Sequence, residues 1–293
     1  MFDLHEHQQE CERYLSRVLS CPVSLIQAKP LEQSTRLAPW RLDVSMNGIE
    51  QIYVLQLDIQ DLEYEYLVLK SMESMEIPTP RVYGLDLDGE ALGVACFVQD
   101  FIEGESLLNP MLTGEAWAAE LYLDAACALQ AITKVELGQV ADWIKRETAS
   151  HVLEKANDFF KNKSNPLAER MYRTLKATCP RLPAVCFSNG DLWLDNFIVR
   201  DQKLAGIIDF QNACFSDPIF EFLLSFFVKP ELKGRGIEER YCQRLGYDPA
   251  ILNWYHGLEY FDTWHWVLLS GESFVHHTVE SLEADIINWL HYC

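Results

Sequence analysis

The hydrophobic pattern of the chain changes from a strand-like to a helix-like period near residue 104, and this change limits the fold more than any other feature. Before it, the segment "WRLDVSMNGIEQIYVLQLD" alternates apolar and polar residues with period two. Asn47-Gly48 in its middle supplies the positive φ angles of a type I′ hairpin turn. Two more strands are expected around turns at Asp88-Gly89 and Glu103-Gly104. The same part of the sequence predicts helices over 4–19 and 61–75.

The remainder of the chain has mainly helical periodicity, interrupted by short strands in the segment "SNGDLWLDNFIVRDQKLAGIIDF". Asp217 before Pro218 is a candidate N-cap for a further helix. The sequence therefore predicts an α+β fold of two lobes, a small β-rich lobe over 1–103 and a larger, mainly helical lobe over 104–293. The other helices are expected over 115–135, 138–162, 165–178, 248–270 and 273–291.

Composition excludes several classes of protein. The 293 residues carry a formal net charge of −20, whereas nucleic-acid binders need clustered Lys and Arg. The longest apolar run, "ALGVACFV", is too short to span a bilayer. The nine cysteines are odd in number and form no C-x-x-C pair, so we expect neither disulfides nor zinc and place the chain in a reducing cytoplasm. The acidity is compatible with a cationic ligand, although solubility alone explains most of it.

Four polar residues stand out in an otherwise largely apolar segment. They are Asp191, Asn196, Asp209 and Asp217. Taken singly, Asp191 and Asn196 are most often turn residues, and Asp217 is explained by helix capping. Asp209 is harder to explain, because a carboxylate between "LAGII" and Phe210 costs several kcal/mol unless it is paired or bound to metal.

The residues "NGDLWLDNFIV" followed by "GIIDFQNACFSDP" resemble the signature of the aminoglycoside phosphotransferase family, which is related to choline kinases and protein kinases. The shared pattern is Asp, four residues, Asn, a strand ending in Ile-Asp-Phe, and Asp-Pro. The resemblance extends over most of the chain in order. It implies a bilobal protein-kinase-like fold and transfer of a phosphoryl group from ATP or GTP with Mg²⁺.

The resemblance also implies roles for the residues of the motif. Asp191 would accept the proton of the acceptor hydroxyl, while Asn196 and Asp209 would provide the hard oxygen ligands that Mg²⁺ prefers. Asn189 stands where the family has a histidine two residues before the catalytic Asp. Asn189 and Asp217 would support the loop and would not contact substrate.

The nucleotide side departs from the family pattern. Gln56 occupies the position of the Lys or Arg that holds the α- and β-phosphates, so Glu63 on the next helix lacks the usual cation. The loop "AKPLEQSTRLAPW" has no glycine, although Ser34 could still donate to a phosphate. Val54 would lie over the adenine, and the backbone between Asp100 and Ile102 would bond the adenine edge.

The acceptor side is the least specified. The segment "NWYHGLEYFDTWHW" is dense in aromatic and acidic residues, which could hold a cation or could simply form a helix-packing core. We expect the candidate acceptor pocket to include Glu221, Asp262 and Trp264. No role is assigned to the eight histidines.

Two functions remain open at this point. The first is an ATP- and Mg²⁺-dependent kinase that phosphorylates a hydroxyl of a small molecule similar to an aminoglycoside, choline or an amino sugar. The second is a pseudokinase that binds a nucleotide or metabolite without transfer, as the uncharged Gln56 suggests. We expect no nucleic-acid or membrane partner. The sequence does not specify the acceptor or the oligomeric state.

Overall fold

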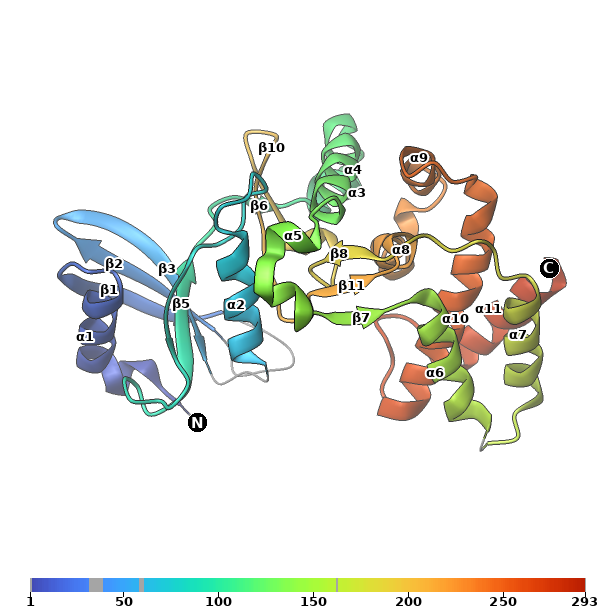
Figure 1. Cartoon of the computed structure of the whole chain (residues 1–293), viewed down its shortest axis with the longest axis horizontal. Coiled ribbons are helices and arrows are strands. Elements are labelled where there is room, and N and C mark those ends of the chain that lie inside the picture. Colours follow the sequence, from blue (N-terminus) through green and yellow to red (C-terminus); the bar gives the residue numbers. More distant parts are fainter. Residues whose placement is uncertain (1, 32–38, 58–60, 162, 293) are drawn as a thin grey trace. The chain divides into compact units, whose positions relative to one another are not determined.

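The computed structural model describes residues 2–31, 39–57, 61–161 and 163–292. These residues form two compact units (Figure 1). The first contains residues 1–106, 134–143 and 197–212, and the second contains 107–133, 144–196 and 213–293. Two segments from later in the chain therefore fold with the N-terminal unit. No helix in the described ranges is long and apolar enough to cross a membrane.

The first unit is built on a five-stranded sheet in the order β1-β2-β3-β5-β4, whose named pairs are all antiparallel. Asn47 and Gly48 both have positive φ angles, 54° and 79°, which confirms the hairpin turn between β2 and β3. The strands are β1 (Val23–Pro30), β2 (Trp40–Met46), β3 (Ile49–Leu57), β4 (Val82–Asp86) and β5 (Cys96–Asp100).

Each face of this sheet is covered by one helix. Residues of η1 (Leu4–His7) and α1 (Gln8–Val18) pack in one hydrophobic cluster with the face that carries Trp40, Leu42 and Val44. The opposite face carries Phe97, whose ring packs edge-on against Tyr66 of α2 (Leu62–Met72). The strand β1 was not predicted, because a register shift between Leu25 and Gln27 breaks its alternation.

The first unit also contains a small three-stranded sheet in the order β10-β9-β6. Its strand β6 is the next strand in the chain after β5. In this sheet the backbone of Gly104 lies close to the backbone of Val199. A Cβ atom at this position would come within 2.4 Å of the carbonyl oxygen of Val199, so a larger residue would displace the strand. The elements are β6 (Glu105–Ser106), β9 (Phe197–Arg200), β10 (Lys203–Ile207), α5 (Lys134–Leu137) and η2 (Gly138–Asp142).

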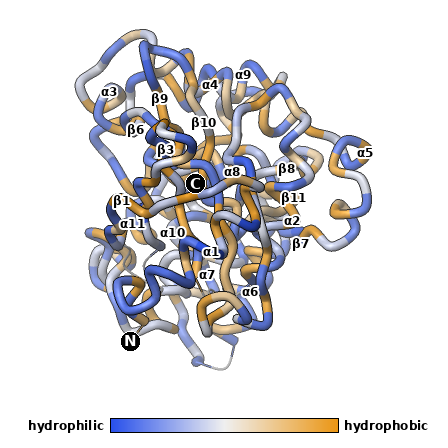
Figure 2. The backbone as a smooth tube through the Cα atoms, turned by 90° about the vertical axis from the view of Figure 1, so that its left-hand side faces the viewer, coloured by the Kyte–Doolittle hydropathy of each residue, from blue (hydrophilic) through white to orange (hydrophobic). Residues whose placement is uncertain are grey.

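The second unit is mainly helical and contains a three-stranded sheet, in which β11 pairs parallel to β7 and antiparallel to β8. The apolar sequence of α8 can be followed in Figure 2. Its helices are α3 (Leu108–Thr113), α4 (Ala116–Gln130), α6 (Ala149–Lys161), α7 (Pro166–Ala177), α8 (Pro218–Val228), α9 (Ile237–Arg244), α10 (Leu252–Ser270) and α11 (Val279–Tyr292). Its strands are β7 (Lys145–Glu147), β8 (Cys186–Ser188) and β11 (Cys214–Ser216), and its short 3-10 helices are η3 (Leu194–Asn196), η4 (Pro230–Leu232) and η5 (Pro249–Ile251).

The expected helix over 138–162 is wrong in its first half. That half contains η2 and then β7, whose residues pair with Cys214–Ser216 of β11, and α6 starts only at Ala149. The helix expected from residue 273 begins at Val279, and α3 and α9 were not predicted. Short helices such as α9 give too few turns for a periodic signal.

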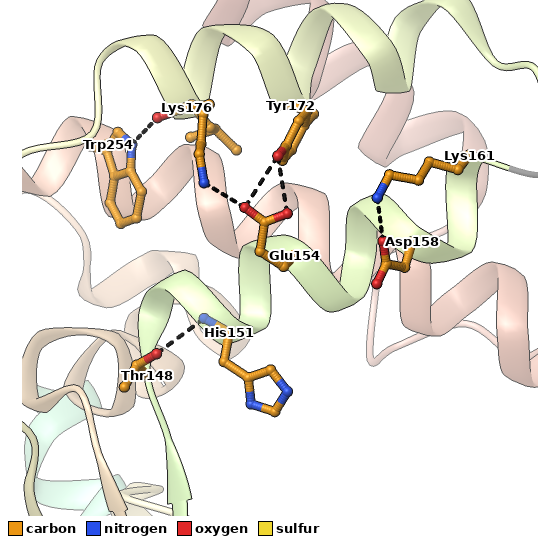
Figure 3. A network of polar contacts seen from close by, with 9 residues as sticks. Thr148, His151, Glu154, Asp158, Lys161, Tyr172, Lys176 and Trp254 are labelled. Atoms are coloured by element: carbon orange, nitrogen blue, oxygen red, sulfur yellow. Dashed lines mark hydrogen bonds and ion pairs between the residues drawn. The ribbon is translucent and has the colours of Figure 1, made fainter.

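Polar contacts on the outer side of α6 and α7 form the network in Figure 3. Glu154 accepts from Lys176 and from the Tyr172 hydroxyl, and Asp158 pairs with Lys161. These side chains lie at the surface, where ion pairs contribute little to stability. The indole of Trp254, by contrast, is buried and donates to the carbonyl of Leu175 at 2.8 Å, which connects α10 to α7.

The start of α8 is fixed by Asp217, the N-cap that the sequence predicts. One carboxylate oxygen accepts from the backbone N–H groups of Ile219 and Phe220 at 3.0 and 3.2 Å, and the other accepts from the Tyr255 hydroxyl at 2.7 Å. Asp217 therefore joins the first turn of α8 to the first turn of α10.

We expect Asp217→Ala to lower the free energy of unfolding by about 2–4 kcal/mol. About 1 kcal/mol is the lost cap, and the remainder is the buried Tyr255 hydroxyl left without its acceptor. Urea unfolding measures this difference. Asp248→Ala is the matched control, because Asp248 caps the exposed turn η5 and binds no buried hydroxyl. Equal losses in the two variants would contradict the joining role of Asp217.

Candidate active site

The loop between β8 and β9 carries Asp191 and is braced by its own amide side chains. Asn189 is fully buried, and its Nδ2 donates to the carbonyl oxygen of Asp191 at 2.9 Å. Asn196 Nδ2 donates to the same oxygen, also at 2.9 Å. Gly190, with a φ angle of +77°, makes the turn before Asp191. Asn189 thus provides hydrogen bonds that shape the loop.

The next carbonyl along the loop is held from two helices. The oxygen of Leu192 accepts from the Tyr122 hydroxyl of α4 at 2.6 Å and from Ser225 Oγ of α8 at 3.1 Å. Sequence reasoning missed both residues. Ser225 carries the one detectable signal, since it is a polar residue on the apolar face of "FLLSFFV".

Asn196 is suited to hold a hard cation. Its Nδ2 is engaged by the carbonyl of Asp191, which turns its Oδ1 away from that contact. An amide oxygen fixed in this way is a ligand type that Mg²⁺ accepts. Within the described ranges no group of three His, Cys, Asp or Glu side chains could hold a metal ion. A magnesium that takes few protein ligands, with phosphates and water completing its shell, is compatible with this finding.

Asp209 belongs to the first unit and lies two residues beyond the end of β10. Its φ angle of 61° places it in the left-handed region, which is uncommon for a residue other than glycine. Such conformations concentrate at functional sites. The following Phe210 is fully buried, so the backbone on both sides of Asp209 is anchored in the unit.

The first unit places Val54 and Gln56 on the face of the sheet opposite α1. Gln56 is 4% exposed, and its Oε1 has no hydrogen-bond partner among the described residues. Gln99, the register partner of Val54, shares that face and has the same unpaired oxygen. The sequence alone does not indicate that Gln99 lies beside Gln56, because the face on which Gln99 lies depends on how β5 pairs with β3.

The segment after β5 is held by local contacts. The side chain of Asp100 accepts from the Tyr83 hydroxyl at 3.0 Å. Ile102 packs against Gly206 of β10, where an added Cβ would lie 3.1 Å from it. The Arg41 guanidinium lies 4.9 Å from the centre of the Phe101 ring. Ser34 falls outside the described residues.

The acidic residue expected on the helix after β3 is placed differently. Glu63 is exposed, whereas Glu65 is 1% exposed and lies on the buried face of α2 with Val68 and Leu69. The exposure of Glu63 fits a solvent-facing helix residue, the alternative to an ion-pair acid at this position. Tertiary packing determines which face of α2 is buried. The sequence of this short helix does not specify that face by itself.

In the second unit, a cavity of about 210 Å³ that is partly open to solvent lies between α8 and α10 beside the Asp191 loop. Trp264 does not line it. This side chain is fully buried and packs on Phe160 with ring centres 4.5 Å apart, so it belongs to the helical core. The tryptophan at the cavity is Trp266, two residues further. Among the residues that line the cavity are Gly190, Glu221, Glu259, Asp262, Trp266 and Phe274.

Two carboxyl groups at this cavity, those of Glu221 and Glu259, have a raised pKa. Burial raises the pKa of Glu221 to about 7, and the negative charges of Asp191 and Glu147 add to the effect. Burial also raises the pKa of Glu259 well above its usual value, with further contributions from Asp262 and Glu221. A cation in the cavity would reverse this effect by favouring the charged forms.

A larger cavity of about 540 Å³ elsewhere in the second unit contains none of the predicted site residues. Its walls include Trp254 and Trp289, whose indole N–H groups already donate to backbone carbonyls of Leu175 and Asn253. The hydrogen-bonding groups of both indoles therefore have partners within the unit and do not need a ligand.

The raised pKa of Glu221 predicts a specific dependence of stability on pH. A carboxyl that holds its proton more tightly when folded contributes stability that is complete below its unfolded pKa of about 4.5 and is lost as the pH rises through about 7. Glu221→Gln stays neutral throughout. We expect the variant to lose less stability than the native chain between about pH 5 and pH 8, by on the order of 2 kcal/mol.

Urea unfolding over this pH range measures the effect. Glu272→Gln is the control, since Glu272 is exposed and its substitution removes the same charge. Parallel stability curves for the native chain and Glu221→Gln would contradict the raised pKa.

Comparisons with known proteins agree with this geometry. An aminoglycoside phosphotransferase from Streptomyces rimosus, APH(3'')-Id, superposes with a TM-score of 0.54 over 89% of this chain and 99% of its own, at 19% identity. The aminoglycoside phosphotransferase APH(4)-Ia, solved in a ternary complex with ADP and hygromycin B, gives 0.66 over 96% and 97%, at 13% identity. A Ralstonia eutropha JMP134 protein assigned as an aminoglycoside phosphotransferase gives 0.72 over 99% and 96%, at 15% identity. At these identities the structures establish the fold.

Sequence comparison adds two findings. Mouse acyl-CoA dehydrogenase family member 10 is 24% identical over 225 residues, which are 66% of this chain and 21% of that protein. The chain therefore spans about a fifth of the length of this curated relative. The sequence profile of the phosphotransferase enzyme family matches residues 53–255, which is more than half of the chain. With its protein-kinase-like fold and its Asp-Asn-Asp motif, the chain belongs to the phosphotransferase enzyme family.

Proposed function

We propose that this phosphotransferase transfers the γ-phosphate of ATP to a hydroxyl group of a small organic molecule. The observation that carries the proposal is the bracing of the Asp191 loop, in which amide and hydroxyl donors fix two successive carbonyl oxygens. Such rigidity suits a reaction that depends on positioning. Relatives of the same fold that bind ADP and hygromycin B support ATP as donor and a hydroxyl-bearing acceptor.

Asp191 is the residue we assign to the acceptor. In the proposed reaction the hydroxyl oxygen forms a bond to the γ-phosphorus, and the bond from that phosphorus to the bridging oxygen breaks, which releases ADP. The hydroxyl proton passes to the Asp191 carboxylate. The side chain of Asp191 is partly exposed, and its backbone is fixed on both sides, so a substrate can reach a carboxylate of defined position.

Asn196 and Asp209 are the residues we assign to Mg²⁺. When bound, Mg²⁺ neutralises phosphate charge and orients the phosphates for transfer. Asn196 contributes a neutral oxygen and Asp209 a charged one, so loss of the second should weaken binding of the metal-nucleotide complex more. Val54 and the backbone from Asp100 to Ile102 are proposed to contact the base.

A pseudokinase remains the second candidate, and Gln56 is the observation that favours it. The position carries no charge, yet its amide oxygen is buried and unpaired among the described residues. Arg41 offers a nearby source of positive charge, since it pairs in register with Val54 and therefore shares the face of Gln56. The charge of its guanidinium is partly neutralised by Asp43, whose Oδ1 lies 2.8 Å from Arg41 Nε.

Two aspartate variants separate catalysis from nucleotide binding. Asp191→Asn should preserve the affinity for Mg²⁺-ATP and lower turnover by about 10² or more, because only the proton acceptor is lost. Asp209→Asn should weaken Mg²⁺-ATP binding, because a charged ligand is lost. Calorimetry with Mg²⁺-ATP and a coupled assay for ADP release provide the two readouts.

Asp195→Asn is the matched control on the same loop. Asp195 is exposed and accepts from the indole of Trp193, so its substitution should leave affinity and turnover unchanged. Full turnover by Asp191→Asn on an accepted substrate would refute the role of Asp191 as base.

Gln56→Lys tests whether the phosphates lie at this position. An ammonium group beside the phosphates should tighten Mg²⁺-ATP binding by about tenfold, equivalent to on the order of 1 kcal/mol in a partly solvated site. Gln51→Lys makes the same change at an exposed position of the same strand and should have little effect. If the two variants bind Mg²⁺-ATP alike, Gln56 does not face the phosphates.

A further inference from the structure

Two buried amide side chains lie on the face of the first unit's sheet that packs against α2. Gln56 of β3 is 4% exposed, and Gln99 of β5 is 7% exposed. Their side-chain oxygens have no hydrogen-bond partner among the described residues. A buried polar atom that has lost its water is unfavourable unless another polar group, a bound water or an ion replaces it. Two such oxygens on one face of one sheet indicate a ligand that they share.

The register of β3 with β5 brings the two amides close together. Gln56 lies opposite Phe97, and Gln99 lies opposite Val54, so these four side chains are on one face of the sheet. Gln56 and Gln99 are therefore diagonal neighbours on adjacent antiparallel strands. Such neighbours are about 7–8 Å apart, a distance that long side chains bridge. One small ligand can therefore contact both amide oxygens.

The helix that covers this face adds a negative charge. Glu65 of α2 is 1% exposed and lies on the buried side of the helix. The next residue, Tyr66, packs edge-on against Phe97 with ring centres 5.6 Å apart, and α2 contacts β5 (Figure 1). Phe97 is the register partner of Gln56. Glu65 therefore lies in the layer between α2 and the strands that carry the two amides.

A metal cation of single charge is the ligand that suits this set of atoms. Two neutral amides and one carboxylate together carry one negative charge, which a monovalent ion neutralises and a divalent ion exceeds. Mg²⁺ is a poor candidate because it loses its water reluctantly and requires octahedral geometry. A water molecule can donate hydrogen bonds to both amide oxygens, but it brings no charge to the buried carboxylate.

We propose that Gln56, Gln99 and Glu65 bind a monovalent metal cation, which we assign as K⁺. Neutral amide and carbonyl oxygens replace the hydration shell of K⁺ in other proteins, and K⁺ gives up its water more easily than Na⁺. The three residues belong to the first unit. Binding of the ion therefore requires neither a nucleotide nor an acceptor, and the inference goes beyond the proposed function.

Thermal unfolding of the full chain without Mg²⁺ or nucleotide tests the site. The chloride salts of K⁺, Na⁺ and N-methyl-D-glucamine are compared at equal ionic strength, so that screening is the same in each. We expect an unfolding midpoint about 2–4 °C higher in K⁺ than in the organic cation, which corresponds to a ligand at about ten times its Kd. Equal midpoints in these two salts would overturn the proposal, and a higher midpoint in Na⁺ than in K⁺ would overturn the assignment of K⁺.

Variants locate the ion, and each is compared with itself across the salts so that its own stability cancels. Gln56→Leu and Gln99→Leu each remove one oxygen ligand and should weaken apparent K⁺ affinity about tenfold or more. Gln56→Lys should abolish the K⁺ response, because its ammonium group brings the same charge to the same place. Gln51→Leu, at an exposed position of β3, should keep the full response. A full response in both Gln56→Leu and Gln99→Leu would overturn the assignment of these ligands.

Anomalous scattering from Rb⁺, a K⁺ analogue, gives the position of the ion directly. Crystals grown with Rb⁺ should show an anomalous peak in contact with the side-chain oxygens of Gln56 and Gln99. No peak at these two oxygens would refute the site.

One consequence of the site rests on the proposed function. A bound K⁺ supplies positive charge at the position where Gln56 supplies none, so the native chain should bind Mg²⁺-ATP about tenfold more tightly in K⁺ than in the organic cation. Gln56→Lys should bind it equally in both salts. If K⁺ raises the unfolding midpoint but leaves Mg²⁺-ATP affinity unchanged, the cation site stands and its link to the phosphates is wrong. If Mg²⁺-ATP does not bind in any salt, the proposed function is wrong, and the unfolding data alone decide the cation site.

Discussion

The candidate active site depends on the fixation of two adjacent backbone carbonyls, those of Asp191 and Leu192. Four side-chain donors reach them, two from the loop and one each from α4 and α8. Each hydrogen bond adds only about 1 kcal/mol, but a buried carbonyl that loses its donors costs more than that. The loop backbone therefore has few alternative conformations, and the position of this backbone restricts where the Asp191 carboxylate can lie.

The same set of hydrogen bonds also explains why several polar residues are buried in the second unit. Ser225 and Tyr122 serve one carbonyl, and Asp217 serves the first turn of α8 and the hydroxyl of Tyr255. These contacts join α4, α8 and α10 around the loop. The acidic cavity lies between two of the same helices, so the proposed catalytic and acceptor groups share one rigid support.

The sequence predicted the parts of the fold that depend on local chemistry. The Asn47-Gly48 turn, the cap at Asp217 and the strand pair β9–β10 follow from residue type and spacing. The spacing of Asp191, Asn196 and Asp209 was also sufficient to indicate the family. The remaining features depend on tertiary contacts. β7 forms by pairing with β11, and the burial of Glu65, with Glu63 left exposed, follows from how α2 packs.

The acceptor side illustrates the same limit. Aromatic density in α10 indicated either a core or a cation site, and the structure places one tryptophan of this segment in the core and another at a cavity. Trp264 is in the core and Trp266 is at the cavity, a difference of two residues that the helical pattern alone could not assign.

Phosphorus NMR of the native chain with Mg²⁺-ATP and a panel of small molecules that carry a hydroxyl group is the most direct test of the central claim. The account predicts that one acceptor yields a new phosphomonoester resonance and that ADP accumulates in equal amount. Formation of ADP and inorganic phosphate alone, or no turnover of a bound nucleotide with any hydroxyl compound, would contradict it.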